Sequence, residues 1–104
     1  MHHIRDSQMY GQIKLFAGTA CRPLADEIAA YLGVPLSGRD IIKFPNENIF
    51  VRLHASVRGQ DCYVIQTTSA PVSDNLMELL IAVQTLRLDS AARITVVIPY
   101  LAYA

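Results

Sequence analysis

The sequence predicts an α/β fold in which a mostly parallel β-sheet is flanked by helices and carries a β-hairpin excursion. Segments rich in β-forming residues alternate with segments whose apolar residues recur at helical spacing, and this order favours parallel strands joined by right-handed crossovers. Two extended segments on either side of a short polar tip predict the hairpin. A chain of 104 residues has the length of one domain with a modest core.

The beginning of the chain predicts a leader, a strand and the start of a helix. Residues 1–12 are polar and lack periodicity, so we expect a flexible leader followed by one domain over residues 13–104. The first β-rich run is IKLFA at residues 13–17, and Gly18 ends it. Thr19 then lies where its hydroxyl would cap a helix.

The middle of the chain predicts a helix and then the hairpin. Gly33 lies where the helix would end. Extended runs at residues 41–44 and 49–53 predict the two strands of the hairpin, and Pro45 is tolerated because it lies at the edge of the first run. The helix is predicted from the helical spacing of Leu24, Ile28, Ala29 and Leu32, and the hairpin tip consists of Asn46, Glu47 and Asn48.

The second half of the chain predicts a buried strand, a long helix and a final strand. CYVIQ at residues 62–66 is nearly continuous in β-forming residues, which indicates burial on both faces, as in parallel sheets. Ser73 is the candidate cap of the helix, and Asp74 lies near the positive end of that helix. Pro99 stops the last run, RITVVI at residues 93–98. The long helix carries a broad apolar stripe of Leu76, Leu79, Leu80, Val83 and Leu86.

Composition and charge exclude several classes of protein. Nine acidic residues balance nine basic residues without a run of like charge, so we expect no nucleic-acid partner and no anionic membrane surface. Glu78 and Gln84 break the longest apolar run, which is too short to span a bilayer, and the N-terminus has no apolar signal core. Cys21 and Cys62 are too few for a disulfide framework, which indicates reduced thiols in a cytoplasmic protein.

Familiar catalytic motifs are absent from the sequence: it has no phosphate-binding or dinucleotide-binding glycine loop, no zinc-protease motif and no serine-nucleophile elbow. We interpret His54 as a surface or satisfied histidine and Cys62 as a small buried hydrophobe. Asp74, Asn75 and Glu78 are close enough along a helix to bind magnesium together, but helix capping explains Asp74 more simply.

Two short segments are candidate ligand sites. At the hairpin tip, asparagine amides can hydrogen-bond an adenine edge while Phe44 stacks on its face, although turns also favour asparagine for backbone reasons. Ser56 and Arg58 place a hydroxyl beside a guanidinium, which is the chemistry of a phosphate clamp and also the composition of an ordinary surface turn. Residue chemistry alone leaves both interpretations open.

From residue 13 to residue 104 the sequence resembles the N-terminal part of ribose-phosphate diphosphokinase, the phosphoribosyl diphosphate synthetase family. The most specific segments are SVRG at 56–59, DNLMELL at 74–80 and RITVVIPYLAYA at 93–104, which occur in the family in this order and at this spacing. The resemblance implies a phosphoribosyltransferase-like fold, truncated here. It also implies an enzyme that transfers the diphosphoryl group of Mg-ATP to ribose 5-phosphate, giving phosphoribosyl diphosphate and AMP.

The resemblance also implies site residues. In the family, a hairpin loop of the pattern Phe-Ser-Asp/Asn-x-Glu reaches the adenine of ATP in a neighbouring subunit, which implies a homo-oligomer. This sequence departs from the pattern at three positions: Asn48 stands where the family has glutamate, Glu47 is displaced by one position, and Pro45 replaces serine. These differences affect the expected adenine contact and not the expected fold. The candidate ATP-binding residues are therefore Phe44, Asn46, Glu47 and Asn48, and Ser56 and Arg58 match a regulatory site for phosphate or ADP.

The family's catalytic residues and the ligands of its Mg²⁺ would follow Ala104, so the resemblance implies no catalytic residue in these 104 residues and no activity for this piece alone. Two alternatives stay open. Pro45 and Asn48 leave room for a non-catalytic subunit that associates with the synthetase. The second alternative is an inactive α/β fragment that associates with itself, since a truncated sheet leaves an unpaired edge and an apolar helix surface.

Overall fold

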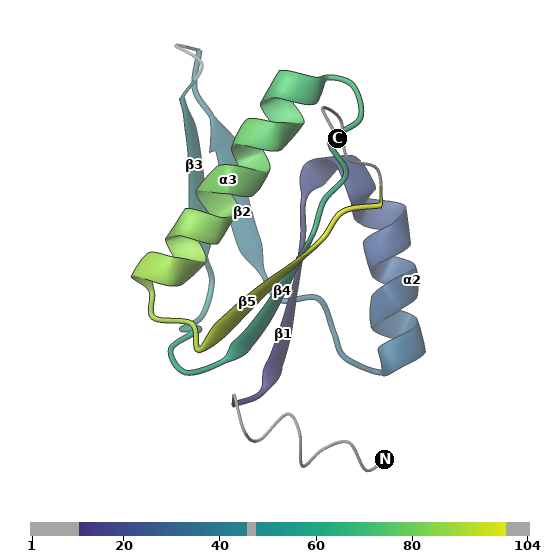
Figure 1. The fold of residues 1–104 in the computed structure, drawn as a ribbon, viewed down its shortest axis with the longest axis vertical. Helices are drawn as coiled ribbons and strands as arrows, with labels where there is room; N and C mark the ends of the chain where they lie inside the picture. Colours follow the sequence, from purple (N-terminus) through teal and green to yellow (C-terminus); the bar gives the residue numbers. More distant parts are fainter. Residues whose placement is uncertain (1–10, 46–47, 100–104) are drawn as a thin grey trace.

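The structure is a computed structural model, and it describes residues 11–45 and 48–99. Its elements alternate between strands and helices around one short hairpin, as Figure 1 shows. In chain order they are β1 (Ile13–Ala17), the 3₁₀ turn η1 (Thr19–Cys21), α2 (Arg22–Leu32), β2 (Arg39–Lys43), β3 (Ile49–Leu53), β4 (Asp61–Ile65), α3 (Val72–Leu88) and β5 (Arg93–Val97).

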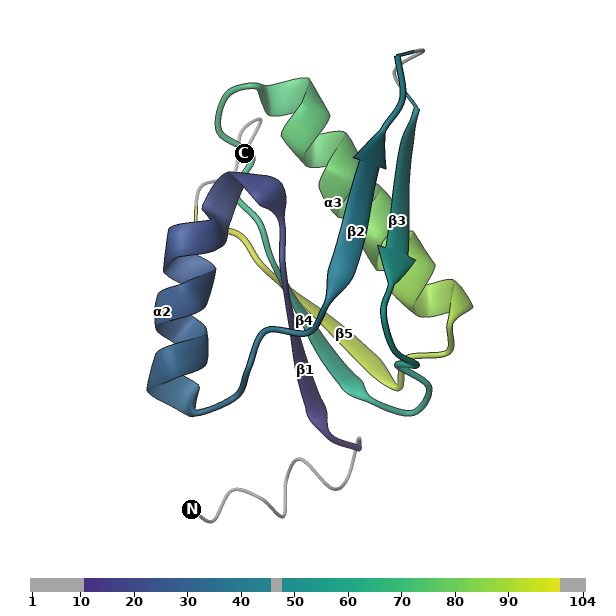
Figure 2. The same ribbon diagram turned by 180° about the vertical axis from the view of Figure 1, so that it is seen from behind.

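Strands β1, β4 and β5 form a parallel sheet in the order β1-β4-β5, while β2 and β3 pair antiparallel as a separate hairpin. In the sheet register, Phe16 lies opposite Val64, and Val64 lies opposite Val96. Helix α2 covers one face of the sheet, whereas α3 and the hairpin lie on the other face (Figure 1, Figure 2). The predicted α/β fold with a parallel sheet, flanking helices and a hairpin excursion is therefore confirmed.

Successive side chains of β4 point to opposite faces of the sheet, and this divides the core between the two faces. Val64 belongs to an apolar cluster with Phe16 and Leu79 on the α3 side, while the next residue, Ile65, packs with Ala25 on the α2 side. Both β4 residues are almost completely buried. The predicted burial of this strand on both faces is confirmed, although β4 begins at Asp61, one residue earlier than expected.

Two predictions of helix caps were wrong. Helix α3 begins at Val72 after Pro71, so Ser73 lies inside its first turn and no side chain caps it. Thr19 begins the 3₁₀ turn before α2, and its hydroxyl donates a hydrogen bond to the Glu78 carboxylate at 2.7 Å instead of capping the helix. The end of α2 is as predicted, because Gly33 adopts the left-handed conformation with φ of 70° that favours glycine.

Helix α3 packs differently from its apolar pattern. Leu79 and Leu86 of the predicted stripe are buried against the sheet, but Leu80 is 54% exposed. Two polar residues, Asn75 and Glu78, take buried positions on this helix. The face that α3 turns toward the sheet is therefore partly polar at its N-terminal half. In residues 11–45 and 48–99, no helix has the length and apolar character needed to cross a bilayer.

Candidate functional site

The hairpin tip presents Phe44 to solvent. Phe44 follows the last residue of β2, and its backbone N–H donates to the Asn48 carbonyl at 2.8 Å, which closes the tip. Half of the Phe44 side chain, 49%, is exposed, so the ring is available to a planar ligand. The candidate residues Asn46 and Glu47 lie outside the described residues.

A surface hollow of about 470 Å³ lies beside this tip. Phe44 and Asn48 line it from the hairpin, and Met77 and Ile81 line it from α3. Its walls combine aromatic and aliphatic side chains with one amide, which suits a flat ring that carries polar edges. The structure thus brings two of the predicted tip residues to one hollow, with Ile49 and Phe50 completing its lining.

Ser56 and Arg58 also lie together, in the loop between β3 and β4. The Ser56 hydroxyl accepts a hydrogen bond from the Arg58 backbone N–H at 3.2 Å, and both side chains are exposed. Val57, between them, is 1% exposed and anchors the loop in the core. The two residues line a second hollow of about 500 Å³, together with Asp89 and Ser90 after α3. Ser56 and Arg58, the residue types of a phosphate clamp, therefore line one open space, to which Asp89 adds a carboxylate.

The sequence identified Glu78 as a charge within an apolar run, but it did not predict that this carboxylate is buried and hydrogen-bonded. Glu78 is 1% exposed and accepts hydrogen bonds from the Thr19 backbone N–H at 2.8 Å and from the Thr19 hydroxyl at 2.7 Å. The Gln66 side-chain amide donates a third hydrogen bond to it at 3.1 Å. A carboxylate with three donors can stay in the interior because its oxygens are satisfied. The signal in the sequence was a single charge within the apolar run of α3.

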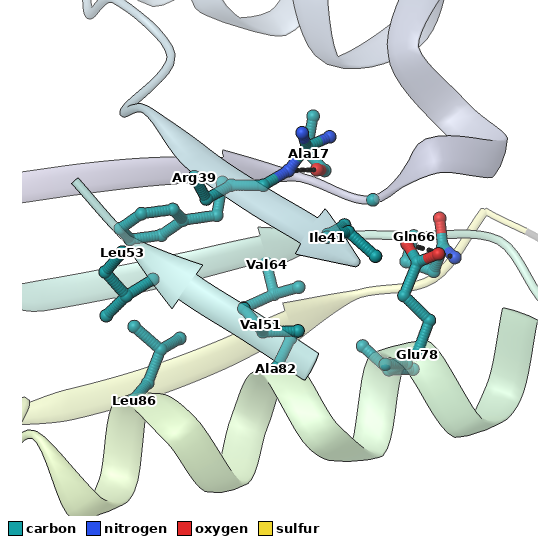
Figure 3. A pocket seen from close by; sticks show the side chains of 13 residues that line it. Ala17, Arg39, Ile41, Val51, Leu53, Val64, Gln66, Glu78, Ala82 and Leu86 are labelled. Carbon is teal, nitrogen blue, oxygen red and sulfur yellow. Dashed lines mark hydrogen bonds between the residues drawn. The ribbon is translucent and has the colours of Figure 1, made fainter. Parts of the chain in front are cut away.

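This carboxylate also connects the hairpin to the sheet. Lys43 Nζ lies 3.7 Å from Glu78 Oε1, and Lys43 is the residue immediately before Phe44. In Figure 3, the Glu78 and Gln66 side chains approach each other below the hairpin strand that carries Ile41. Glu78 therefore holds together the loop after β1, the end of β4, helix α3 and the base of the hairpin tip.

Beneath the hairpin, the space between sheet and α3 is nearly filled. A cavity of about 20 Å³, room for about one water molecule, is lined by Ile41 and Val51 of the hairpin, Val64 of the sheet and Ala82 of α3 (Figure 3). Such a cavity is too small for a nucleotide. The two surface hollows described above have volumes of ligand size, and the hairpin packs on the core.

The other residues considered as candidates have structural roles. Asn75 donates from its side chain to the Ser69 carbonyl at 2.7 Å, so it does not join Asp74 and Glu78 in a metal site. Across the described ranges, no group of three or more His, Cys, Asp or Glu side chains is placed to hold a metal ion. His54 Nε2 lies 2.9 Å from Asp40 Oδ1, as a satisfied surface histidine, and burial raises the pKa of the Cys62 thiol to about 11.

Comparison with known protein families matches residues 13–104 to the N-terminal domain of ribose phosphate pyrophosphokinase. A ribose-phosphate pyrophosphokinase of Brucella melitensis is 48% identical over 92 residues, which cover 88% of this chain and 30% of that protein. Ribose-phosphate pyrophosphokinase 2, chloroplastic, of Oryza sativa is 51% identical over 100 residues, which cover 96% of this chain and 24% of that protein. The chain thus spans less than a third of the length of these relatives.

A solved structure leads to the same family. The crystal structure of phosphoribosylpyrophosphate synthetase from Mycobacterium smegmatis is similar with a TM-score of 0.85 and 43% sequence identity. The match covers 88% of this chain and 30% of that one. The resemblance drawn from the sequence is confirmed, and the chain belongs to the enzyme family of ribose-phosphate pyrophosphokinases, whose N-terminal domain it matches.

Proposed function

We propose that the protein to which this domain belongs transfers the diphosphoryl group of ATP to ribose 5-phosphate, giving phosphoribosyl diphosphate and AMP. The match of residues 13–104 to the family is the observation that carries this proposal. Because the chain spans only 24% to 30% of the length of these two relatives, the reaction is assigned to the whole protein. The domain's own contribution is to bind and position a ligand.

Within that reaction, the hairpin tip contacts the adenine of ATP through Phe44, Asn46, Glu47 and Asn48. The half-exposed ring of Phe44 and the hollow that it shares with Asn48 support this role. An aromatic ring stacks on a base, while an amide can both donate to and accept from its edge. The backbone hydrogen bond from the Phe44 N–H to the Asn48 carbonyl closes the tip, which limits the motion of the ring before ATP arrives.

We infer a regulatory role for the Ser56–Arg58 hollow, with phosphate or ADP as its ligand. Ser56 and Arg58 line one open space, and the buried Val57 fixes the loop between them. The same proposal includes Mg²⁺ bound to ATP, with its protein ligands outside the described residues. It also includes a homo-oligomer in which a neighbouring copy approaches the hairpin tip. A cytoplasmic location accords with the two buried free thiols of Cys21 and Cys62.

The proposed reaction can be tested in a chimera in which residues 13–104 replace the matching segment of the Mycobacterium smegmatis enzyme. The chimera is expected to form AMP and phosphoribosyl diphosphate from ATP and ribose 5-phosphate, because the segment supplies the same fold and the same hairpin. Product formation is measured by chromatography of the nucleotides. The unaltered enzyme is the control.

A chimera that folds and assembles like the unaltered enzyme but forms no product would contradict the proposal. That result would favour the non-catalytic associated subunit. The departures from the family pattern at Pro45 and Asn48 would then be the first positions to revert.

A further inference from the structure

A third hollow lies where β1 ends and α2 begins, and it shares His54 with the Ser56–Arg58 hollow. Its volume is about 140 Å³, and it is lined among others by Arg22, Ser37, Arg39 and His54. These residues come from the start of α2, the segment before β2, the start of β2 and the loop after β3. None of the described residues that line it carries a carboxylate. The carboxyl ends of parallel strands, where this hollow lies, are the usual place for ligands in α/β folds.

Arg39 is held in position by the main chain. Its Nε donates to the Ala17 carbonyl at 2.8 Å, and Figure 3 shows this bond reaching from β2 to the end of β1. Within residues 11–45 and 48–99, this carbonyl is the only polar partner of the guanidinium. The terminal Nη groups of a half-buried arginine are therefore available for another acceptor. A fixed guanidinium whose two terminal Nη groups are available can donate two hydrogen bonds to one oxyanion.

Arg22 supplies a second positive charge to the same hollow. It is the first residue of α2, where the partial positive charge of the helix also favours an anion. Its Nε pairs with Asp26 at 3.1 Å, but both side chains are more than half exposed and one helical turn apart. Pairs of this kind are weak, so Arg22 can turn toward a ligand at little cost.

Gly38 and His54 complete the wall of the hollow. A Cβ at position 38 would collide with the imidazole Nδ1, so the absence of a side chain lets the ring lie against this backbone. The His54 backbone N–H donates to the Gly38 carbonyl at 3.1 Å, which fixes this close approach. Asp40, next to Arg39 in β2, is engaged by Arg52 and His54, whose hydrogen bonds lower its pKa.

We propose that this Arg22–Arg39 hollow binds a phosphate group, either as the free anion or as a phosphate monoester. Arg22 and Arg39, on separate elements, line a space to which no carboxylate of the described residues contributes, and the Ala17 carbonyl fixes the Arg39 side chain. Bringing like charges together is unfavourable unless an anion lies between them. The proposal does not depend on the adenine contact at the hairpin tip.

The test is a titration of the ¹⁵N-labelled chain with inorganic phosphate and, separately, with ribose 5-phosphate, at an ionic strength held constant with sodium chloride. We expect saturable shifts of the backbone amides of Gly18, Arg22, Ser37 and Arg39. Arg22→Gln is expected to weaken this binding roughly tenfold, because a charge-assisted hydrogen bond is lost. Since Arg22 is exposed, Arg22→Gln is expected to keep the fold. Arg39→Lys retains the positive charge but removes the planar guanidinium, so it tests whether the site requires the guanidinium.

Arg87→Gln is the matched control, because it removes an exposed arginine of α3 that lines none of the three hollows and should leave these shifts unchanged. Arg58→Gln, in the neighbouring hollow, tests whether phosphate bound there causes the shifts. Equal affinity for the two ligands would support a site for the free anion. At least tenfold tighter binding of ribose 5-phosphate would support a monoester site. The proposal is overturned if the shifts do not saturate, or if Arg22→Gln and Arg39→Lys both bind with unchanged affinity. It is also overturned if Arg58→Gln abolishes the shifts.

Discussion

At the scale of single residues, the structure depends on a charge in an unusual place. Glu78 occupies a position of α3 that faces the sheet and is 1% exposed, yet each of its oxygens has hydrogen-bond donors from Thr19 and one accepts from Gln66. Removing water from a carboxylate is costly, so these donors decide whether the residue stabilises or destabilises the fold. The ion pair with Lys43 lies at the solvent side and adds little.

Glu78→Gln is therefore expected to lower the free energy of unfolding by about 2 kcal/mol. Glutamine is the same size, but its NH₂ group would face a donor where the carboxylate oxygen accepts a hydrogen bond. Urea unfolding followed by circular dichroism measures the difference. Glu27→Gln, on the exposed side of α2, is the control and should change the value by less than about 0.5 kcal/mol. Equal stability of the two variants would contradict the role of the buried network.

Cys62 gives a prediction about pH. Burial first, and the nearby charge of Asp61 second, raise the pKa of its thiol from 9.0 to about 11. At pH 8, a thiol with this pKa is only about one part in a thousand thiolate, which is the reactive form. Modification by iodoacetamide is expected to be slow in the folded chain and to rise with pH up to about 11. The urea-unfolded chain, with Cys62 exposed, is the control, and equally fast labelling of the folded chain at pH 8 would contradict the prediction.

Single residues also mark the limit of what could be predicted from the sequence. Gly33 ended α2 as expected, because a left-handed residue after a helix is a local requirement. Thr19 and Ser73 were assigned as caps from the same kind of local rule, but Thr19 bonds to a residue 59 positions away. Polar side chains that can cap a helix can also satisfy a buried partner, and only the tertiary structure decides between the two.

At the scale of elements, the junction after β1 is fixed by close packing. Gly18 has an ordinary φ of −72°, so its backbone conformation does not require glycine. A Cβ there would collide with the side chain of Gln66, which is fully buried and itself hydrogen-bonded to Glu78. Space, and not backbone freedom, therefore explains this glycine.

Gly18→Ala is expected to destabilise the fold by about 2 kcal/mol, as overpacking of a filled interior does. Gly33→Ala is the contrasting variant, because a Cβ at Gly33 would meet nothing within 4 Å and the cost would come only from its φ of 70°. That cost is about 1 kcal/mol. Thermal unfolding of both variants shows which of the two substitutions destabilises the fold more. A smaller loss for Gly18→Ala than for Gly33→Ala would contradict the packing argument.

The strands were predicted well because their signals are local. β1 and β3 have the bounds expected from their β-forming runs, while the hairpin tip lies between β2 and β3 as the polar residues indicated. Helix α3 was predicted, but the residues of its buried face were not. Hydrophobicity alone predicted that Leu80 would be buried and that Glu78 would interrupt the apolar run, whereas Leu80 is exposed and Glu78 is buried. The hollow at the start of α2 could not be predicted, because Arg22 and Arg39 meet only through the fold.

At the scale of the whole molecule, α3 leaves apolar side chains uncovered. Met77 and Leu80 are about half exposed, and Leu88 is 73% exposed. Met77 and Leu80 are three residues apart on one side of the helix, and Gln84 separates them from Leu88. Exposed apolar side chains on one side of a helix mark a surface that associates with another protein.

The chain is therefore expected to self-associate, and Leu80→Lys is expected to shift it toward the monomer. A charge placed in an apolar contact must lose its hydration there, which weakens association. Sedimentation velocity over a range of concentrations measures the change. Tyr31→Lys, at a 90% exposed residue of α2, is the control for added charge. Unchanged association in Leu80→Lys together with loss in Tyr31→Lys would place the contact on α2 instead.

The central claim for the whole molecule is that this domain presents Phe44 to the adenine of ATP. The most direct test is the KM for each substrate in the chimera described above and in its Phe44→Ala variant, with Tyr31→Ala as an exposed aromatic control. We predict that Phe44→Ala raises the KM for ATP about tenfold, through loss of stacking on the base, and leaves the KM for ribose 5-phosphate within about twofold. An unchanged KM for ATP in an active Phe44→Ala chimera would contradict the claim.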